Sequence, residues 1–194
     1  AYTCRLGLAV VKKPLIDGGI FTAENLGWIG AAYLWGYGAG KVINGFLADR
    51  VNVRRFIPTG LMISALINIF MGCNTLVVVA VVLWGINGWF QGFLAPSSVV
   101  SITQWFSGKR RGTMYGLWSS AHSIGEGLTY FGTSALVTVS LWNAAFIGPG
   151  LTCMVVAVAV YFGLRDRPQT MGLPPVSEWA GSAIGQSIGN ARSP

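Results

Sequence analysis

Four residues with ionisable side chains stand inside long apolar stretches of the sequence: Arg5, Lys41, His122 and Glu126. Placing a charged side chain at the centre of a lipid bilayer costs on the order of 2.5–3.5 kcal/mol on insertion scales. Such residues therefore face a protein interior or an aqueous cavity. Two cations without neighbouring acids point to an anionic ligand. A phosphate dianion suits both, because arginine offers bidentate contacts and lysine a point charge.

An aromatic residue precedes three of these side chains by one helical turn. The pairs are Tyr2 with Arg5, Tyr37 with Lys41, and Trp118 with His122. Residues three or four apart on a helix share a face, so the three pairs predict the wall of one central binding site. The alternative is that the two cations extend to the membrane surface or form structural ion pairs.

His122 and Glu126 are four residues apart and fall on one helical face. The carboxylate could stabilise the charged form of an imidazole that contacts the ligand. The two residues could instead couple proton movement, or form a buried hydrogen-bonded pair. A zinc site is not expected, since no third ligand is evident. No serine or cysteine lies near a recognisable base, so we expect no catalytic residue, metal or cofactor, and no enzyme.

The composition identifies the surroundings of these residues. Of the 194 residues, 53% are hydrophobic and 10% are charged, whereas ordinary globular chains carry roughly 25% charged residues. This indicates an all-α membrane protein. Residues 1–13 resemble the end of a crossing whose start is missing, and Pro14 to Asn25 form a loop in which Thr22 caps the next helix. Complete crossings are predicted at 26–48, 56–72, 76–105, 113–138 and 142–164.

Six crossings result, with a kink expected at Pro96. We predict a transmembrane bundle over residues 1–164, with its first helix truncated, and a polar loop or tail over 165–194. Glycines four residues apart predict close helix contacts, although such spacings also arise by chance in a chain with 27 glycines. These pairs are Gly36 and Gly40, Gly88 and Gly92, and Gly112 and Gly116.

The net charge of +7 comes from 13 basic and 6 acidic residues, and its distribution predicts an orientation. The basic residues are too few and scattered for nucleic-acid binding. If the loops at 49–55 and 106–112 and the tail lie on the same side of the membrane, that side carries nine basic residues. The opposite side then carries only Lys12 and Lys13. The nine are Arg50, Arg54, Arg55, Lys109, Arg110, Arg111, Arg165, Arg167 and Arg192. That side is predicted to be cytoplasmic, with both ends of the chain.

The stretch from Gly45 to Arg55 resembles the loop between helices two and three of the major facilitator superfamily, whose pattern is G-x-x-x-D-R-x-G-x-R-R. The matching residues are Gly45, Asp49, Arg50, Arg54 and Arg55. Asn52 stands at the second glycine, and asparagine tolerates the left-handed conformation best after glycine. The resemblance implies a cytoplasmic latch whose pairing changes as the two halves of a transporter rock. The alternative is a plain positive loop.

A second block is similar to the signature of the organophosphate:phosphate antiporters, R-G-x5-W-[NS]-x-x-H-N-aliphatic-G-G. Here it runs from Arg111 to Glu126. The resemblance implies that Arg5 binds the substrate phosphate and that Lys41 and His122 face the central cavity. It also places Tyr2, Tyr37 and Trp118 around that cavity.

Three departures from the family pattern concern the site. Ser123 and Glu126 replace the usual asparagine and glycine, and Ala95 replaces a bulky aromatic, which would widen the cavity. We hypothesise that Glu126 pairs with Lys41 or His122 when the site is empty and releases them to the phosphate.

The resemblance implies a twelve-helix fold with the substrate between two halves, of which this chain is the N-terminal, six-helix half. A second phosphate-binding arginine would come from helix seven. The expected function is exchange of inorganic phosphate for a phosphate ester, of the hexose phosphate or glycerol 3-phosphate class, in a bacterial cytoplasmic membrane. The expected partners are these solutes, the lipid bilayer and the missing half. A membrane sensor for external hexose phosphate and an enzyme acting on phosphate esters are the alternatives.

Overall fold

The computed structural model describes residues 3–48, 50–139, 142–174 and 176, with backbone only at 109, 138 and 139. Within these residues the chain forms seven α-helices, one short 3-10 helix and no strand, which confirms the predicted all-α class. The elements are α1 (Thr3–Asp17), α2 (Ala23–Ala48), α3 (Val53–Gly72), α4 (Val77–Gly92), α5 (Leu94–Trp105), α6 (Gly108–Val139), α7 (Ala144–Gly163) and η1 (Pro168–Met171).

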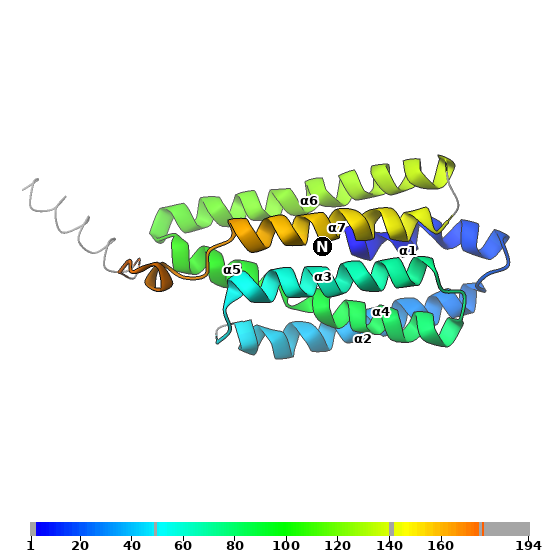
Figure 1. Cartoon of the computed structure of the whole chain (residues 1–194), viewed down its shortest axis with the longest axis horizontal. Helices are drawn as coiled ribbons and strands as arrows, with labels where there is room; N and C mark the ends of the chain where they lie inside the picture. Colours follow the sequence, from blue (N-terminus) through cyan, green and yellow to red (C-terminus); the bar gives the residue numbers. More distant parts are fainter. Residues whose placement is uncertain (1–2, 49, 140–141, 175, 177–194) are drawn as a thin grey trace, which may run out of the picture.

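The helices run alongside one another as a bundle (Figure 1). Among the described residues, α3, the α4–α5 span Val77–Trp105 and α7 are long and apolar enough to cross a membrane, judged by length and composition. Since α4 and α5 belong to one span, the seven described helices correspond to the six predicted segments, of which these three meet the criteria for a crossing. Large apolar side chains such as Trp35, Phe131 and Val78 are exposed on the bundle. The chain is a polytopic membrane bundle.

The first loop is shorter than predicted, because α1 continues through Pro14 to Asp17. Proline removes one helical N–H, but the helix ends only where Gly19 adopts a left-handed φ of 65°. A glycine there costs little, so it sets the end of the helix. The predicted cap is confirmed: the Thr22 hydroxyl accepts from the Asn25 amide at 3.2 Å, and α2 begins three residues earlier than expected.

The kink predicted at Pro96 is a full interruption between α4 and α5. A proline ring clashes with the carbonyl four residues earlier, here that of Gly92, the last residue of α4. Phe93 lies at the break and is almost fully buried. Its ring packs where a Cβ on Gly60 of α3 would be, so this glycine makes room for the interruption.

Glycines bring α2 and α4 into backbone contact. A Cβ on Gly40 would lie 2.5 Å from the Trp89 carbonyl oxygen, and a Cβ on Gly92 would lie 2.7 Å from the Lys41 amide nitrogen. Gly36 and Gly88 lie equally close to the facing helix, which confirms two of the predicted glycine pairs. The third prediction is wrong for the described residues, because Cβ atoms on Gly112 and Gly116 would meet nothing within 4 Å.

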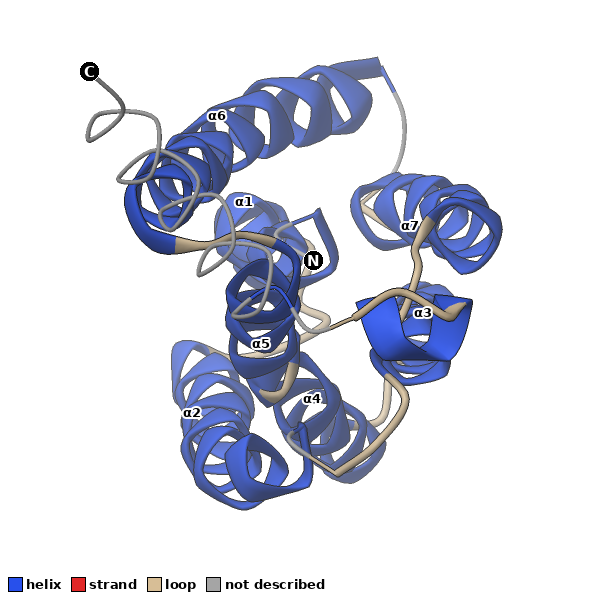
Figure 2. Cartoon of the chain, turned by 90° about the vertical axis from the view of Figure 1, so that its left-hand side faces the viewer, coloured by secondary structure: helices blue, strands red, loops and turns tan. Residues whose placement is uncertain are grey.

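Seen end-on, α1 and α5 occupy the middle of the bundle, and α6 lies at its outer edge (Figure 2). The loops before α3 and before α6 and the stretch after α7 share one end (Figure 1). The carboxylate of buried Asp166 accepts from the Val53 amide at 2.8 Å. Its carbonyl accepts from the Trp105 indole at 3.1 Å. The beginning of the predicted tail is therefore tied to α3 and α5.

The α2–α4 contact generates a prediction. Gly40→Ala places a methyl group against the Trp89 carbonyl and should destabilise the protein by about 1–3 kcal/mol, as overpacking does. Gly38→Ala on the same helix has open space and serves as the control. Thermal unfolding of the purified full-length protein in detergent measures the difference. Equal melting temperatures for the two variants would contradict the close contact.

Candidate functional site

An open cavity of about 210 Å³ lies between five helices. It is lined by Arg5 of α1, Tyr37 of α2, Gln91 of α4, Leu94, Ala95 and Ser98 of α5, and Trp118, Ala121 and His122 of α6. Four residues predicted from helical spacing alone, Arg5, Tyr37, Trp118 and His122, are thus brought to one space. The described lining contains two basic side chains and no acid, so the cavity is suited to an anion.

The two predicted cations lie against the same aromatic ring. The Arg5 guanidinium carbon is 5.5 Å from the centroid of Tyr37, and the Lys41 ammonium nitrogen is 5.8 Å from it. Tyr33 stacks on Tyr37 at 6.0 Å and is 5.7 Å from Arg5. Aromatic faces attract cations, so the Tyr37 ring holds two positive groups near each other. One anion could then contact both of them. Lys41 adjoins the cavity but is not part of its lining.

One stripe of α6 faces the bundle. It carries Trp118, His122, Glu126, Thr129 and Thr133, spaced by three or four residues, and its two threonines are buried. The rings of Trp118 and His122 are 5.4 Å apart. Glu126 is half-buried on this stripe and outside the cavity lining. The pairing of Glu126 with Lys41 or His122 stays a hypothesis.

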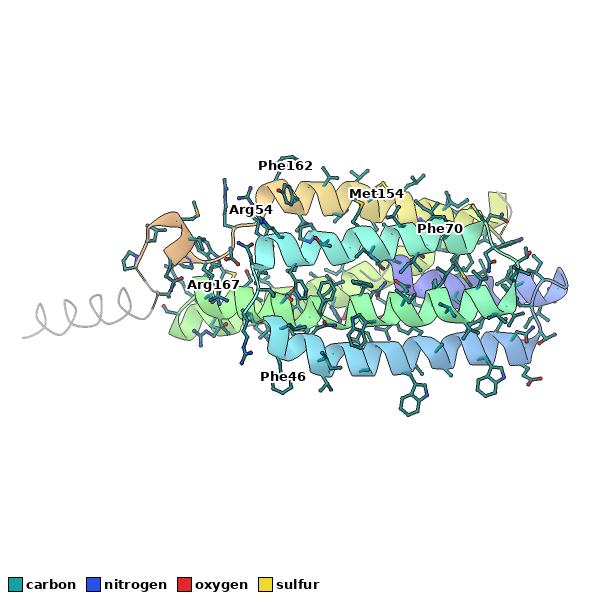
Figure 3. All side chains as sticks on the ribbon, turned by 60° about the horizontal axis from the view of Figure 1, so that its bottom comes forward. Phe46, Arg54, Phe70, Met154, Phe162 and Arg167 are labelled. Carbon is teal, nitrogen blue, oxygen red and sulfur yellow. The ribbon has the colours of Figure 1, made fainter. Side chains whose placement is uncertain are left out.

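Two predicted residues, Tyr2 and Asp49, lie outside the described residues. The rest of the predicted latch lies at one end of the bundle. The Arg54 Nε donates to the Tyr161 carbonyl at 3.3 Å, and its guanidinium lies 5.7 Å from the Tyr161 ring. Figure 3 shows Arg54 near Phe162, at the end where Phe46 and Arg167 also lie.

The remaining latch residues make few contacts. Arg50 and Arg55 are exposed, and a Cβ on Gly45 would meet nothing within 4 Å. The left-handed conformation suggested for Asn52 is wrong, because its φ is −73°. Asn52 instead caps α3 by accepting from the Arg55 amide at 3.3 Å. Its side chain thus provides a helix cap that glycine could not.

Gln91 is a cavity residue that was not predicted from the sequence. Its side chain is buried and lines the cavity from α4. The sequence feature that points to this residue is a polar amide between two glycines of an apolar run. Polar side chains in membrane helices, like charged ones, face the protein interior. Gln91 carries no charge, so the cost of burying a charge did not reveal it. In the described part of the chain, no group of three or more His, Cys, Asp or Glu could hold a metal ion.

Comparison with known proteins relates this arrangement to a family. The model of the Major Facilitator Superfamily matches residues 9–191. The chain is 37% identical over 178 residues to the "Probable hexose phosphate transport protein" of Chlamydia pneumoniae, covering 92% of this chain and 39% of that protein. It is 32% identical over 183 residues to the "Membrane sensor protein UhpC" of Salmonella typhimurium, covering 94% and 41%.

A third relative is the "Glycerol-3-phosphate transporter" of Bacillus subtilis, which is 35% identical over 186 residues, covering 92% of this chain and 41% of that protein. The chain therefore spans about two fifths of the length of these relatives.

The shared ring generates a second prediction. Tyr37→Leu removes the face that both cations contact and should weaken binding of inorganic phosphate about tenfold, while Tyr37→Phe should stay within about twofold. Tyr161→Leu is the control, because Tyr161 meets Arg54 outside the cavity. Equilibrium binding of labelled phosphate to the full-length protein measures the change. Equal losses of phosphate affinity in the Tyr37 and Tyr161 variants would show that the Tyr37 ring has no specific role in phosphate binding.

Proposed function

Because the chain belongs to the Major Facilitator Superfamily, we propose that it forms the N-terminal half of an antiporter that exchanges inorganic phosphate for an organic phosphate ester. The observation that carries this proposal is the position of Arg5 and Lys41 beside one tyrosine at an open cavity. A guanidinium can bind two phosphate oxygens at once, and an ammonium adds a second positive charge.

The size of the cavity supports a shared site. Its volume of about 210 Å³ is below the roughly 300–1,000 Å³ of complete ligand pockets. The relatives are more than twice as long as this chain, so the remaining walls belong to the second half of the transporter. The half alone binds solutes poorly and transports nothing.

The mechanism is alternating access. The phosphate group bound by Arg5 and Lys41 adds negative charge beside them, and reorientation of the loaded carrier is easier than that of the empty one. His122 and Trp118 form the opposite wall, on α6. Ala95 widens the part of the cavity beside α5, where the organic group of the ester has room. The end bearing Arg50, Arg54 and Arg55 faces the cytoplasm.

A membrane sensor for hexose phosphate is the second candidate, because one relative of similar identity is named as a membrane sensor. Both functions use the same basic residues to recognise phosphate. They differ in flux, since a sensor binds the ester and reports it without exchanging it for phosphate.

The function is tested with the full-length protein in phosphate-loaded liposomes, supplied outside with glucose 6-phosphate or glycerol 3-phosphate. Arg5→Gln should reduce exchange of labelled phosphate at least about tenfold, since it removes charge-assisted hydrogen bonds. Arg165→Gln, at an exposed arginine after α7, should exchange like the parent. Saturable exchange that depends on Arg5 supports an antiporter. Binding of the ester without flux would make the protein a sensor, and undiminished exchange by Arg5→Gln would refute the assignment of the phosphate site.

The hypothesis for Glu126 is tested in the same liposomes. If this carboxylate competes with phosphate for Lys41 or His122, Glu126→Gln should bind phosphate several-fold more tightly and should alter the pH dependence of binding. Glu24→Gln, at an exposed acid in the first turn of α2, is the control. Affinity and pH dependence that match those of the parent would remove Glu126 from the mechanism.

A further inference from the structure

A continuous network of polar side chains lies in the core beside the cavity. Ser64 Oγ donates to Asn87 Oδ1 at 2.5 Å, and Gln91 Nε2 donates to Ser64 Oγ at 2.9 Å and to Asn87 Oδ1 at 3.3 Å. Asn68 Nδ2 donates to the Ser64 carbonyl at 2.9 Å. These residues come from α3 and α4, and all four are buried.

The network ends on the backbone of α1, at the residue before Arg5. Asn68 Nδ2 and Asn87 Nδ2 donate to the same oxygen, the carbonyl of Cys4, at 2.9 and 3.0 Å. One donor comes from α3 and the other from α4, and both asparagines are completely buried. Two donors arriving from different helices restrict both the rotation and the register of α1 at this point.

The other end of the network lies under the Arg5 guanidinium. The Tyr33 hydroxyl donates to Gln91 Oε1 at 3.3 Å, and the ring of Tyr33 is 5.7 Å from the Arg5 guanidinium carbon. One set of hydrogen bonds therefore fixes the main chain before Arg5 and the ring beside its side chain. The hydrogen-bond network thus acts on the backbone from which the Arg5 side chain starts and on the ring beside its guanidinium.

The network also uses the hydrogen-bond donors of Gln91, so that Arg5 supplies the donors to phosphate on this wall of the cavity. Gln91 lines the cavity, but both hydrogens of its amide are donated to Ser64 and Asn87. It can accept a hydrogen bond from a ligand but has no N–H left to donate. An anion needs donors, so on this wall of the cavity recognition depends on where the Arg5 guanidinium stands.

Packing alone does not account for these amides. Leucine has the same number of side-chain heavy atoms as asparagine and would bury no group that needs a hydrogen bond. Asn68 even keeps its Oδ1 buried with no hydrogen-bond partner in the described part of the chain. What the amides add is direction, because buried hydrogen bonds fix orientation in a way that apolar contacts do not.

We propose that Asn68 and Asn87 are positioning residues, which hold the Cys4 carbonyl so that the Arg5 guanidinium meets phosphate in two-point geometry. This inference rests on the proposed function, in which Arg5 binds the phosphate. The asparagines do not touch the ligand. They act through Arg5, and their effect is on discrimination between phosphate and a tetrahedral anion that carries no proton, such as sulfate.

The test uses the full-length protein in liposomes with inorganic phosphate and inorganic sulfate as probes. The readout is the ratio of the sulfate concentration that inhibits exchange by half to the phosphate concentration that half-saturates it. Asn68→Leu and Asn87→Leu should each lower this ratio about tenfold, since displacing an oriented group by ~1 Å can cost about 100-fold. Ser64→Ala, a milder change that leaves both asparagines in place, should lower it less.

Asn143→Leu is the matched control. The side-chain amide of Asn143, just before α7, donates to a backbone carbonyl of α3, that of Gly72, at 2.8 Å. This is the same kind of hydrogen bond, outside the network and the cavity lining, so the variant should lose stability without losing discrimination. Thermal unfolding of every variant separates the two effects. Equal loss of discrimination in Asn143→Leu and Asn87→Leu, or retained discrimination in both the Asn68 and Asn87 variants, would overturn the proposal.

A double substitution tests whether Asn87 acts through Arg5. Lysine at position 5 keeps the charge but has no bidentate geometry. Asn87→Leu should therefore add no further loss of discrimination to Arg5→Lys, whereas a structural role would cost the same in both backgrounds. If Arg5→Lys and Arg5→Gln both behave like the parent, the proposed function is wrong, and so is the positioning role of the two asparagines. If they lose discrimination while the asparagine variants keep it, only the positioning role fails.

Discussion

The backbone contact between α2 and α4 is the constraint on which the site depends. Glycines on both helices let the two backbones approach so closely that a methyl group on Gly40 would lie 2.5 Å from the Trp89 carbonyl. At that separation the Tyr33 hydroxyl reaches Gln91, and Tyr37 and Gln91 line the same cavity. Larger residues would move the helices apart and open this wall, because bilayer helices gain stability from close packing rather than from exclusion of water.

The second constraint is electrostatic. Arg5 is half-buried and Lys41 is exposed on a bundle whose outer surface carries many apolar side chains, where charged groups are costly unless they find partners. The Tyr37 ring beside both cations and the open cavity lower this cost. The described lining of the cavity carries two basic side chains and no acid, and this charge distribution suits a negatively charged solute.

Particular residues show how far sequence reasoning reached. Arg5, Tyr37, Trp118 and His122 were predictable, because a charge or imidazole in an apolar run must face inward and an aromatic one turn earlier shares its face. The end of α1 was misplaced, since Pro14 is an obvious helix breaker and the left-handed Gly19 a subtler one. The spacing of Gly112 and Gly116 matched a packing motif, yet in the described part of the chain Cβ atoms on these glycines would meet nothing within 4 Å. The spacing of residues along a helix determines which side of the helix they share, and it does not determine which other helix packs against that side.

The sequence by itself determined the class of the protein, the membrane-spanning pattern, the presence of a breaking point near Pro96 and the charged residues that cannot face lipid. These follow from local chemistry, namely hydropathy, backbone restriction and the cost of desolvating a charge. Only the tertiary structure decided that Asn68 and Asn87 share the Cys4 carbonyl and that Gln91 joins the cavity wall. Neutral amides carry no charge penalty strong enough to reveal their partners, and residues more than sixty positions apart meet only after the helices have packed.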